Sequence, residues 1–387
     1  MGRLFTGIAV ALGLATVIGL VMLWPGDVGA PLADGLNTTS ESAEVLGVQE
    51  RVCPGFGDRR CQVVTMRLTS GPDRGRTARL RLGATGLIDP DVDPGDKIKV
   101  TETPDAPPGA LPQVGGEYAL TDFERGRPML VLVLIFVAVT LLFARLRGAL
   151  SLAGLALSLA VVLFFVVPAI LDGKPPLAVA VVGSLAVALI TIPLAHGGGP
   201  KSIAALLGTA ASLLLTALLA SVFTEAAHLT GFSSDEASYL LLAGANVSLD
   251  GLLLAGMVIG ALGVLDDATV SQSSTVIALR GANAALGFRE LFARAMRVGR
   301  DHVSATVNTL VLAYVGAALP VLLLFSSADL GLGEALALEV VATEVVATLV
   351  GSIGLIAAVP LTTALAAALA LSRPAERLAG ATDGHVH

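Results

Sequence analysis

The sequence predicts an α-helical polytopic membrane protein with about eight transmembrane helices and a small extracytoplasmic β-rich domain. Hydrophobic residues make up 54% of the chain and charged residues 14%, against roughly a quarter charged in ordinary soluble domains. Eight apolar stretches approach the roughly 20 residues that a spanning helix needs. A single segment, residues 25–127, lacks such stretches and is rich in Pro, Asp and Arg.

The predicted spans lie near residues 4–24, 128–145, 148–171, 177–195, 202–223, 250–278, 303–325 and 341–371. The first could be a cleaved signal peptide, because Arg3 precedes it and small residues follow at 28–30. Its apolar run exceeds the roughly 7 to 15 residues of most signal cores, however. We therefore favour a retained signal-anchor helix over 1–24, with a seven-helix membrane domain over 128–372 and a tail over 373–387.

Lysine and arginine in short loops indicate the orientation, because they concentrate on the cytoplasmic side. With the N-terminus inside, most of these cations fall inside, whereas the short outer loops hold only Lys174. Arg125 and Arg127 lie close to the second span on the outside and weigh against this orientation. The asymmetry predicts a protein of the cell membrane with both termini cytoplasmic and residues 25–127 outside.

The external segment contains five short β-like runs, which are separated by Gly, Pro and Asp. They occupy residues 44–52, 61–69, 76–83, 97–103 and 117–123. Such spacing is typical of a small barrel or meander, and an OB-like or SH3-like barrel is the expected form.

Both cysteines, Cys53 and Cys61, lie in this segment. An oxidising compartment permits a disulfide between them, and two free thiols are the alternative. Two cysteines without a nearby histidine do not complete a tetrahedral metal site. We therefore expect no metal and no cofactor.

The sixth span contains the run GMVIGALGVLDDATVSQSS at residues 256–274. Asp267, Ser271 and Ser274 are spaced i, i+4 and i+7, which places them on one helical face. Polar residues at membrane depth usually face a protein interior, a cavity or a transport path. The three therefore form a candidate ion or substrate pathway. Alternatively, the span covers roughly 240–265 and the polar run is a cytoplasmic connection.

Two neighbouring features of this span are interpreted as structural. Gly256, Gly260 and Gly263 permit close helix approach, so their expected role is helix packing. Asp266 lies about 100° around the helix from Asp267, so the two should not face the same partner. We assign the pathway role to Asp267 and treat Asp266 as incidental.

The last two spans supply candidate partners for this face. Asn308 and Thr309 lie in the seventh span, and Glu344 and Ser352 in the eighth. Asn308 could equally be an ordinary interhelical hydrogen-bonding residue, and Glu344 an interfacial carboxylate. Before the seventh span, apolar residues at helical spacing and arginines on the other face predict a cytoplasmic amphipathic helix near 284–299, lying on lipid headgroups.

Three ordered motifs resemble the YibE/F family of bacterial multi-span membrane proteins. They are the run at 256–274, GRDHVSATVNTLVLAY at 299–314 and GSIGLIAAVP at 351–360. The family pattern has one aspartate followed by small and serine residues, which Asp267, Ser271 and Ser274 match. Asp266 and Gln272 depart from the pattern. The resemblance implies at most a permease.

The layout also resembles proton-driven exporters of the SecD/SecF and RND type, which by analogy implies proton coupling. Our leading hypothesis is a transporter or export-assisting protein that moves a small solute or ion, coupled to a proton or cation through Asp267. The alternatives are an assembly protein whose external domain binds an envelope partner, and an intramembrane enzyme. No recognised catalytic motif occurs, so no catalytic residues are assigned. No basic, aromatic-studded stretch suggests nucleic acid.

Overall fold

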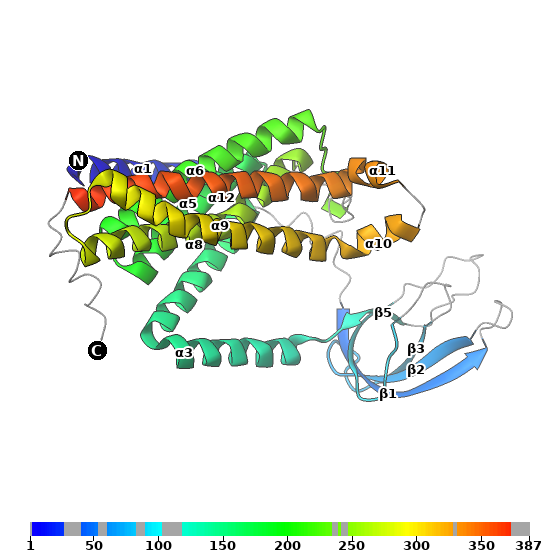
Figure 1. Ribbon diagram of the computed structural model, residues 1–387. Coiled ribbons are helices and arrows are strands. Elements are labelled where there is room, and N and C mark those ends of the chain that lie inside the picture. Colours follow the sequence, from blue (N-terminus) through cyan, green and yellow to red (C-terminus); the bar gives the residue numbers. More distant parts are fainter. Residues whose placement is uncertain are drawn as a thin grey trace. The chain divides into compact units, whose positions relative to one another are not determined.

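The computed structural model of the chain describes residues 2–26, 40–52, 60–82, 90–102, 118–233, 239–240, 247–327 and 331–372. The chain divides into two compact units (Figure 1). One unit combines Met1–Leu32 with Phe143–His387 and is helical. The other covers Ala33–Leu142 and contains an antiparallel sheet. Each unit is described here by itself.

Among the residues that the structure describes, six helices or helix runs are long and apolar enough to cross a membrane, or up to seven if one bent pair forms a single span. These helices suggest a membrane protein. The six are α1 (Gly2–Met22), the run Gly126–Leu171, α5 (Pro176–His196), α6 (Pro200–Ala226), α8 (Leu249–Ala282) and α12 (Glu339–Leu371). The bent pair is α9 (Phe288–Ala317) with α10 (Leu319–Ser327). A short helix, α11 (Leu332–Ala337), precedes α12.

The run Gly126–Leu171 contains the second and third predicted spans. It comprises α3 (Gly126–Val161), the π-helical turn η1 (Val162–Val166) and α4 (Val167–Leu171). Arg145 interrupts α3 with a positive φ of 52° and a ψ of −127°. This break falls on the last residue of the span predicted at 128–145, three residues before the span predicted at 148–171.

Helix α9 differs from the prediction. A separate interfacial helix over 284–299 is not present, because Phe288–Ala317 forms one continuous helix. Its apolar residues Leu291 and Ala295 are fully buried in a cluster with Ala366 and Leu369 of α12. The amphipathic face therefore packs on protein rather than on lipid headgroups. The predicted span 303–325 is broken instead, with a 59° bend between α9 and α10.

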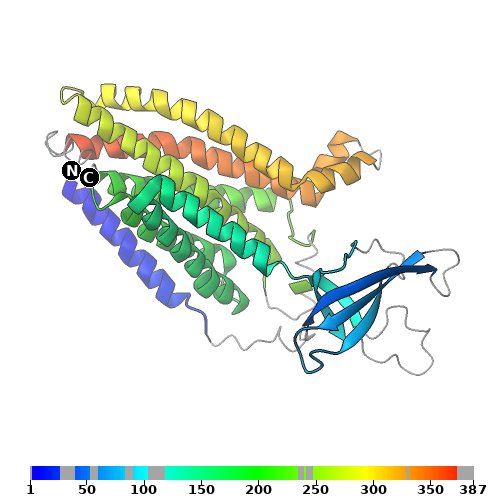
Figure 2. The same ribbon diagram turned by 90° about the horizontal axis from the view of Figure 1, so that it is seen from below.

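Helices α6 and α12 pack closely and antiparallel. A Cβ placed on Gly208 of α6 would lie 2.0 Å from the Oγ1 atom of Thr362. A Cβ on Gly354 of α12 would lie 2.0 Å from the Oγ1 atom of Thr216. Helix α8 contacts both α6 and α12, and α9 runs beside α8 and α12 (Figures 1 and 2). Glycine at two positions thus permits the central contact of the bundle.

Helix α1 packs on α5 through a glycine notch. A Cβ on Gly19 would lie 2.8 Å from a methyl carbon of Val182, and Thr16 is buried. The rings of Trp24 and Phe165 lie 5.8 Å apart between centroids. Beyond the helix, the carboxylate of Asp172 accepts a hydrogen bond from the Gly26 amide at 3.1 Å. That amide, and then Lys174, lower the pKa of Asp172. These contacts attach α1 to the rest of the helical unit, and its retention as a signal anchor stays a prediction.

The two ends of the described chain lie at the same end of the helical unit. A Cβ on Gly2 would lie 3.1 Å from the Ser372 hydroxyl oxygen. The turn between α5 and α6 lies at this end as well, since α1 runs antiparallel to α5 from Gly13 near Leu189 to Gly19 near Val182. We call this the turn end of the bundle.

The five predicted strands are present in the second unit. They are β1 (Ser40–Val52), β2 (Arg60–Leu68), β3 (Thr77–Leu82), β4 (Lys97–Glu102) and β5 (Tyr118–Phe123). The antiparallel sheet has the order β3-β2-β1-β4-β5, so β1 lies at its centre and a simple meander is excluded. Alternating residues such as Val64, Met66, Ile98 and Val100 fill its core. The OB-like or SH3-like barrel stays a prediction.

Cys61 is buried on β2, and the structure contains no free cysteine among the residues it describes. Cys53 lies outside those residues. The Cys53–Cys61 bridge therefore remains a prediction.

The close contact of α6 and α12 can be tested with Gly208→Ala. The new methyl group would meet Thr362, and overpacking of this kind costs about 1–3 kcal/mol. We expect a lower thermal unfolding midpoint in detergent, which Thr362→Ala in the same chain restores in part. Gly256→Ala serves as the matched control, since nothing lies within 4 Å of its added Cβ. Equal midpoints for Gly208→Ala and the wild type would contradict the described packing.

Candidate functional site

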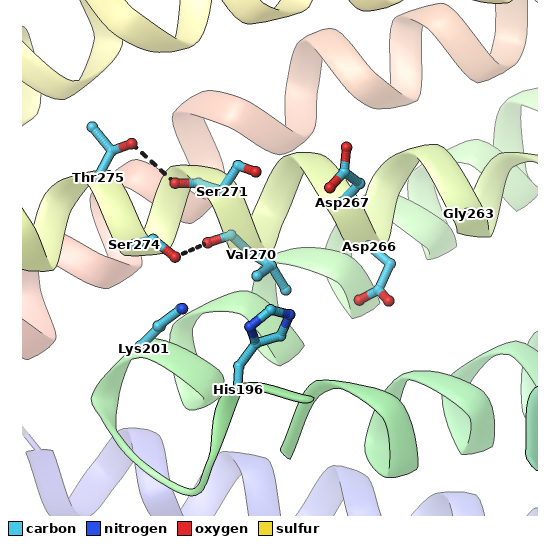
Figure 3. Close-up of a pocket in the computed structure, with 9 residues that line it drawn as sticks. All are labelled: His196, Lys201, Gly263, Asp266, Asp267, Val270, Ser271, Ser274 and Thr275. Carbon is cyan, nitrogen blue, oxygen red and sulfur yellow. Dashed lines mark hydrogen bonds between the residues drawn. The ribbon is translucent and has the colours of Figure 1, made fainter. Parts of the chain in front are cut away.

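A pocket of about 520 Å³ lies in the helical unit beside α8. Its lining comes from the α5–α6 turn and from the polar run of α8 (Figure 3). The lining residues are His196, Lys201, Gly263, Asp266, Asp267, Val270, Ser271, Ser274 and Thr275. The predicted face of Asp267, Ser271 and Ser274 thus borders one cavity.

The polar run lies in the interior of a helix and not in a connection between helices. Helix α8 begins after Ser248, whose hydroxyl accepts a hydrogen bond from the Gly251 amide at 3.1 Å. It continues without a break to Ala282 over 34 residues. Asp266 stands 17 residues after Leu249 and 16 before Ala282, so it occupies the middle of a helix about 50 Å long.

Few hydrogen-bond donors lie near the carboxylate of Asp266. Its Oδ1 atom is buried and has no partner among the described residues. Its Oδ2 atom lies 3.5 Å from the hydroxyl of Thr191, which donates at 2.9 Å to the carbonyl of Val187 instead. A donor–acceptor distance of 3.5 Å is at the outer limit of a hydrogen bond. The carboxylate is therefore half-buried without a strong donor.

This geometry corrects the interpretation of Asp266 as incidental. Asp266 is the more buried acid of the two, whereas Asp267 is exposed. Figure 3 shows Asp266 extending toward the side of α8 on which His196 lies, and Asp267 leaving the helix on the other side. Both acids border the pocket, as the angle of about 100° between adjacent helical residues allows.

The cations of the pocket come from the turn between α5 and α6. His196 ends α5, and Lys201 is the second residue of α6. Gly197 closes α5 with a positive φ of 76°, and its carbonyl accepts a hydrogen bond from the Ser202 hydroxyl. Lys201, Asp267 and Arg147 all act electrostatically on His196. Both carboxylates therefore share the pocket with two basic groups at the turn end of the bundle.

The hydroxyl groups of the pocket donate within their own helix. Ser274 donates to the Val270 carbonyl at 2.6 Å, and Thr275 donates to the Ser271 carbonyl at 3.0 Å (Figure 3). A hydroxyl oxygen that donates its proton still has lone pairs to accept a hydrogen bond or to bind a cation. The pocket can therefore offer oxygen ligands from carboxylates and hydroxyls together. Among the described residues, no three His, Cys, Asp or Glu side chains form a metal-binding group.

The predicted partners on the last two spans do not line this pocket. Asn308 and Thr309 are exposed on α9, and the Thr309 hydroxyl donates to its own helix at Ala305. Glu344 is half-buried and Ser352 is buried on α12. The structure therefore does not bring these four side chains opposite Asp267.

The glycines of α8 also differ from the prediction. A Cβ on Gly256 or Gly263 would meet nothing within 4 Å, so neither residue permits a close contact within the described chain. Gly260 faces the hydroxyl of Tyr314, which would lie 3.4 Å from an added Cβ. Gly263 borders the pocket instead, where its missing side chain leaves space.

Gln272 is a structural residue that the motif comparison treated as a local departure. It is 4% exposed, and its amide nitrogen donates to the Ala295 carbonyl at 3.0 Å and to the Thr363 hydroxyl at 2.7 Å. Gln272 thereby joins α8 to α9 and α12. One turn earlier, Thr269 and Thr209 share a buried hydrogen bond of 2.6 Å between α8 and α6.

Apolar helices of spanning length around a pocket with two acids suggest the class of a membrane protein with a polar site among its helices. A family model described as YibE/F-like protein matches residues 132–372. The chain belongs to this family, as its motifs suggested. No curated protein and no solved structure matched the chain.

The Gln272 junction can be tested with Gln272→Leu, which keeps a similar volume and removes both hydrogen bonds. Two lost bonds and an unpaired carbonyl should destabilise the protein by about 2–4 kcal/mol. We expect a lower apparent unfolding midpoint in detergent. Ser271→Ala is the matched control. Ser271 is adjacent to Gln272 but borders the pocket, so its replacement should change the midpoint little. A midpoint unchanged by Gln272→Leu would show that the junction contributes nothing to stability.

Proposed function

We propose that the protein is a permease whose pocket on α8 takes up a proton or a small cation at Asp266 and Asp267. The observation that carries this proposal is the donor-poor carboxylate of Asp266 beside an open pocket in a candidate span. Asp267 lines the same pocket and is the more exposed of the two acids. We therefore assign to Asp266 much of the proton- or cation-binding role that the sequence assigned to Asp267 alone.

The physical reason is the cost of an uncompensated carboxylate. A buried charge without hydrogen bonds or a partner is strongly unfavourable. For Asp266 that partner could be a proton, a cation or the imidazolium of His196 in the same pocket. Each of these binds reversibly, and a change of partner at Asp266 would change the packing of α8 against α5. A transport cycle can use such a change.

At the opposite end of the bundle, hydrogen bonds fix the start of α12. There the carboxylate of Glu339, the first residue of α12, accepts hydrogen bonds from the amides of Thr230 and Gly231 at 2.6 Å. It also accepts one from the Thr230 hydroxyl at 2.9 Å. These bonds hold the start of α12 to the segment that follows α6. The pocket lies near the turn end, so in this conformation the proposed site is reached from the side that the sequence predicts to be cytoplasmic.

An intramembrane aspartyl protease is disfavoured by the same pocket. Such an enzyme needs two aspartates on facing helices that share a proton. Asp266 and Asp267 are adjacent on α8, and the residues that line the pocket include no acid from a second helix.

The proposal predicts that Asp266→Asn abolishes ion uptake. The amide cannot exchange a proton and binds cations weakly, so uptake should fall at least about tenfold, as a loss of 1.4 kcal/mol would cause. Asp267→Asn should reduce uptake less. The measurement is proton flux, with a pH-sensitive dye inside proteoliposomes that carry an imposed membrane potential, and sodium or potassium uptake in parallel.

The controls separate chemistry from folding. Asp266→Glu keeps the carboxyl group and should retain part of the flux, and Asp250→Asn changes an acid of the same helix outside the pocket. All variants must first elute as folded protein in detergent. Full proton and cation flux in a folded Asp266→Asn, Asp267→Asn double variant would refute the proposal and leave an assembly role for the chain.

A further inference from the structure

The outward face of strands β1, β2 and β3 carries a concentration of arginine. Register places Arg79 opposite Thr65 and Arg81 opposite Val63, on the same side of the sheet. Arg67 pairs with Thr77 on that side, and Arg51 extends it on β1 opposite Cys61. We call Arg51, Arg67, Arg79 and Arg81 the basic face. All four are exposed.

The charge of the basic face is largely uncompensated. Arg67 forms an ion pair with Glu44 at 3.1 Å. Arg51 donates to the neutral amide oxygen of Gln49 at 3.0 Å. Within the described part of the chain, no acid pairs with Arg51, Arg79 or Arg81. The face therefore carries three positive charges that are free to meet an anionic partner.

The other half of the sheet is different. On β4, Lys97 stands opposite Glu44 and Lys99 stands opposite Asp122 of β5. Each lysine there stands opposite a carboxylate, although Glu44 also pairs with Arg67 and Asp122 with Arg125. On the β3 side, by contrast, Arg79 and Arg81 stand opposite the uncharged residues Thr65 and Val63, although the whole chain has a formal net charge of −7.

The connection to the next helix keeps this unit close to a bilayer. Strand β5 ends at Phe123 and α3 begins at Gly126, so only Glu124 and Arg125 lie between them. Two residues extend about 7 Å at most. The first turns of α3 expose apolar side chains, among them Met129, Leu132 and Ile135. If α3 enters the membrane, the sheet cannot leave its surface.

We propose that the basic face binds the anionic phospholipid headgroups of the membrane that holds α3. Charge complementarity selects an anionic surface, and the short connection supplies such a surface at high local concentration. Binding would hold the external unit down on the bilayer. The contact is electrostatic, so it weakens as salt shortens the Debye length.

The test uses the full chain in nanodiscs. Thr77, exposed beside the basic face, is replaced in Thr77→Cys and labelled with a fluorophore, and a fixed fraction of lipid carries a headgroup quencher. Exchange of a third of the neutral lipid for phosphatidylglycerol should increase quenching. Arg79→Glu with Arg81→Glu should cancel the increase, because each cation near an anionic surface shifts the equilibrium roughly fivefold. Salt at 1 M should cancel it too, since the Debye length is then about 3 Å.

Two controls are matched to this design. Lys97→Glu with Lys99→Glu makes the same change of net charge on the half of the sheet where each lysine faces a carboxylate, and it should leave most of the increase. A fluorophore at Thr121→Cys, exposed on β5, should respond less to anionic lipid. Quenching that does not change when phosphatidylglycerol is added would overturn the proposal. The proposal would also be overturned if soluble polyphosphate changed the quenching in neutral discs through Arg79 and Arg81 while anionic lipid had no effect. The partner would then be an anionic polymer.

Discussion

The close contact between α6 and α12 determines how the helical unit is arranged. Gly208 and Gly354 allow the hydroxyls of Thr362 and Thr216 to rest against the facing backbone. Because α8 packs on both helices, its position follows from theirs. The faces of α8 that meet α6 and α12 are buried, and the pocket residues Asp266, Asp267, Ser271 and Ser274 are left on the remaining side. The pocket therefore exists because two other helices approach closely.

Polar side chains occupy two kinds of environment within the helical unit. At the junctions, Gln272 and Thr269 are buried and hydrogen-bonded to neighbouring helices, which fixes the helices in register. Near the pocket, Asp266 is half-buried with an unpartnered oxygen. Buried polar groups are usually satisfied, so an exception next to a cavity indicates a group that awaits a partner. The contrast separates the residues that hold the fold from those that can respond to a ligand.

Local periodicity predicted much of this arrangement, and long-range packing explains what it did not predict. The i, i+4, i+7 pattern placed Asp267, Ser271 and Ser274 on one face, since one helix determines that relation. His196 and Lys201 escaped notice because they lie about 70 residues earlier; a histidine and a lysine flanking three glycines were the available signal. The closest helix contacts lie at Gly208 and Gly354 and not at Gly256 or Gly263, because a small residue permits close approach only where another helix lies near. The amphipathic pattern of α9 was interpreted correctly as two-faced, but composition could not distinguish a protein surface from a lipid surface.

The contact between Gly19 and Val182 has a consequence for biogenesis. The two residues are 182 − 19 = 163 positions apart. During synthesis α1 is made before the β-rich unit and α3, and both of these follow before α5 exists to contact it. Contacts of such separation form late, after the intervening chain has been placed. Helix α1 therefore remains without this partner until the chain between the two residues has been made, and its contact with α5 is among the last to form.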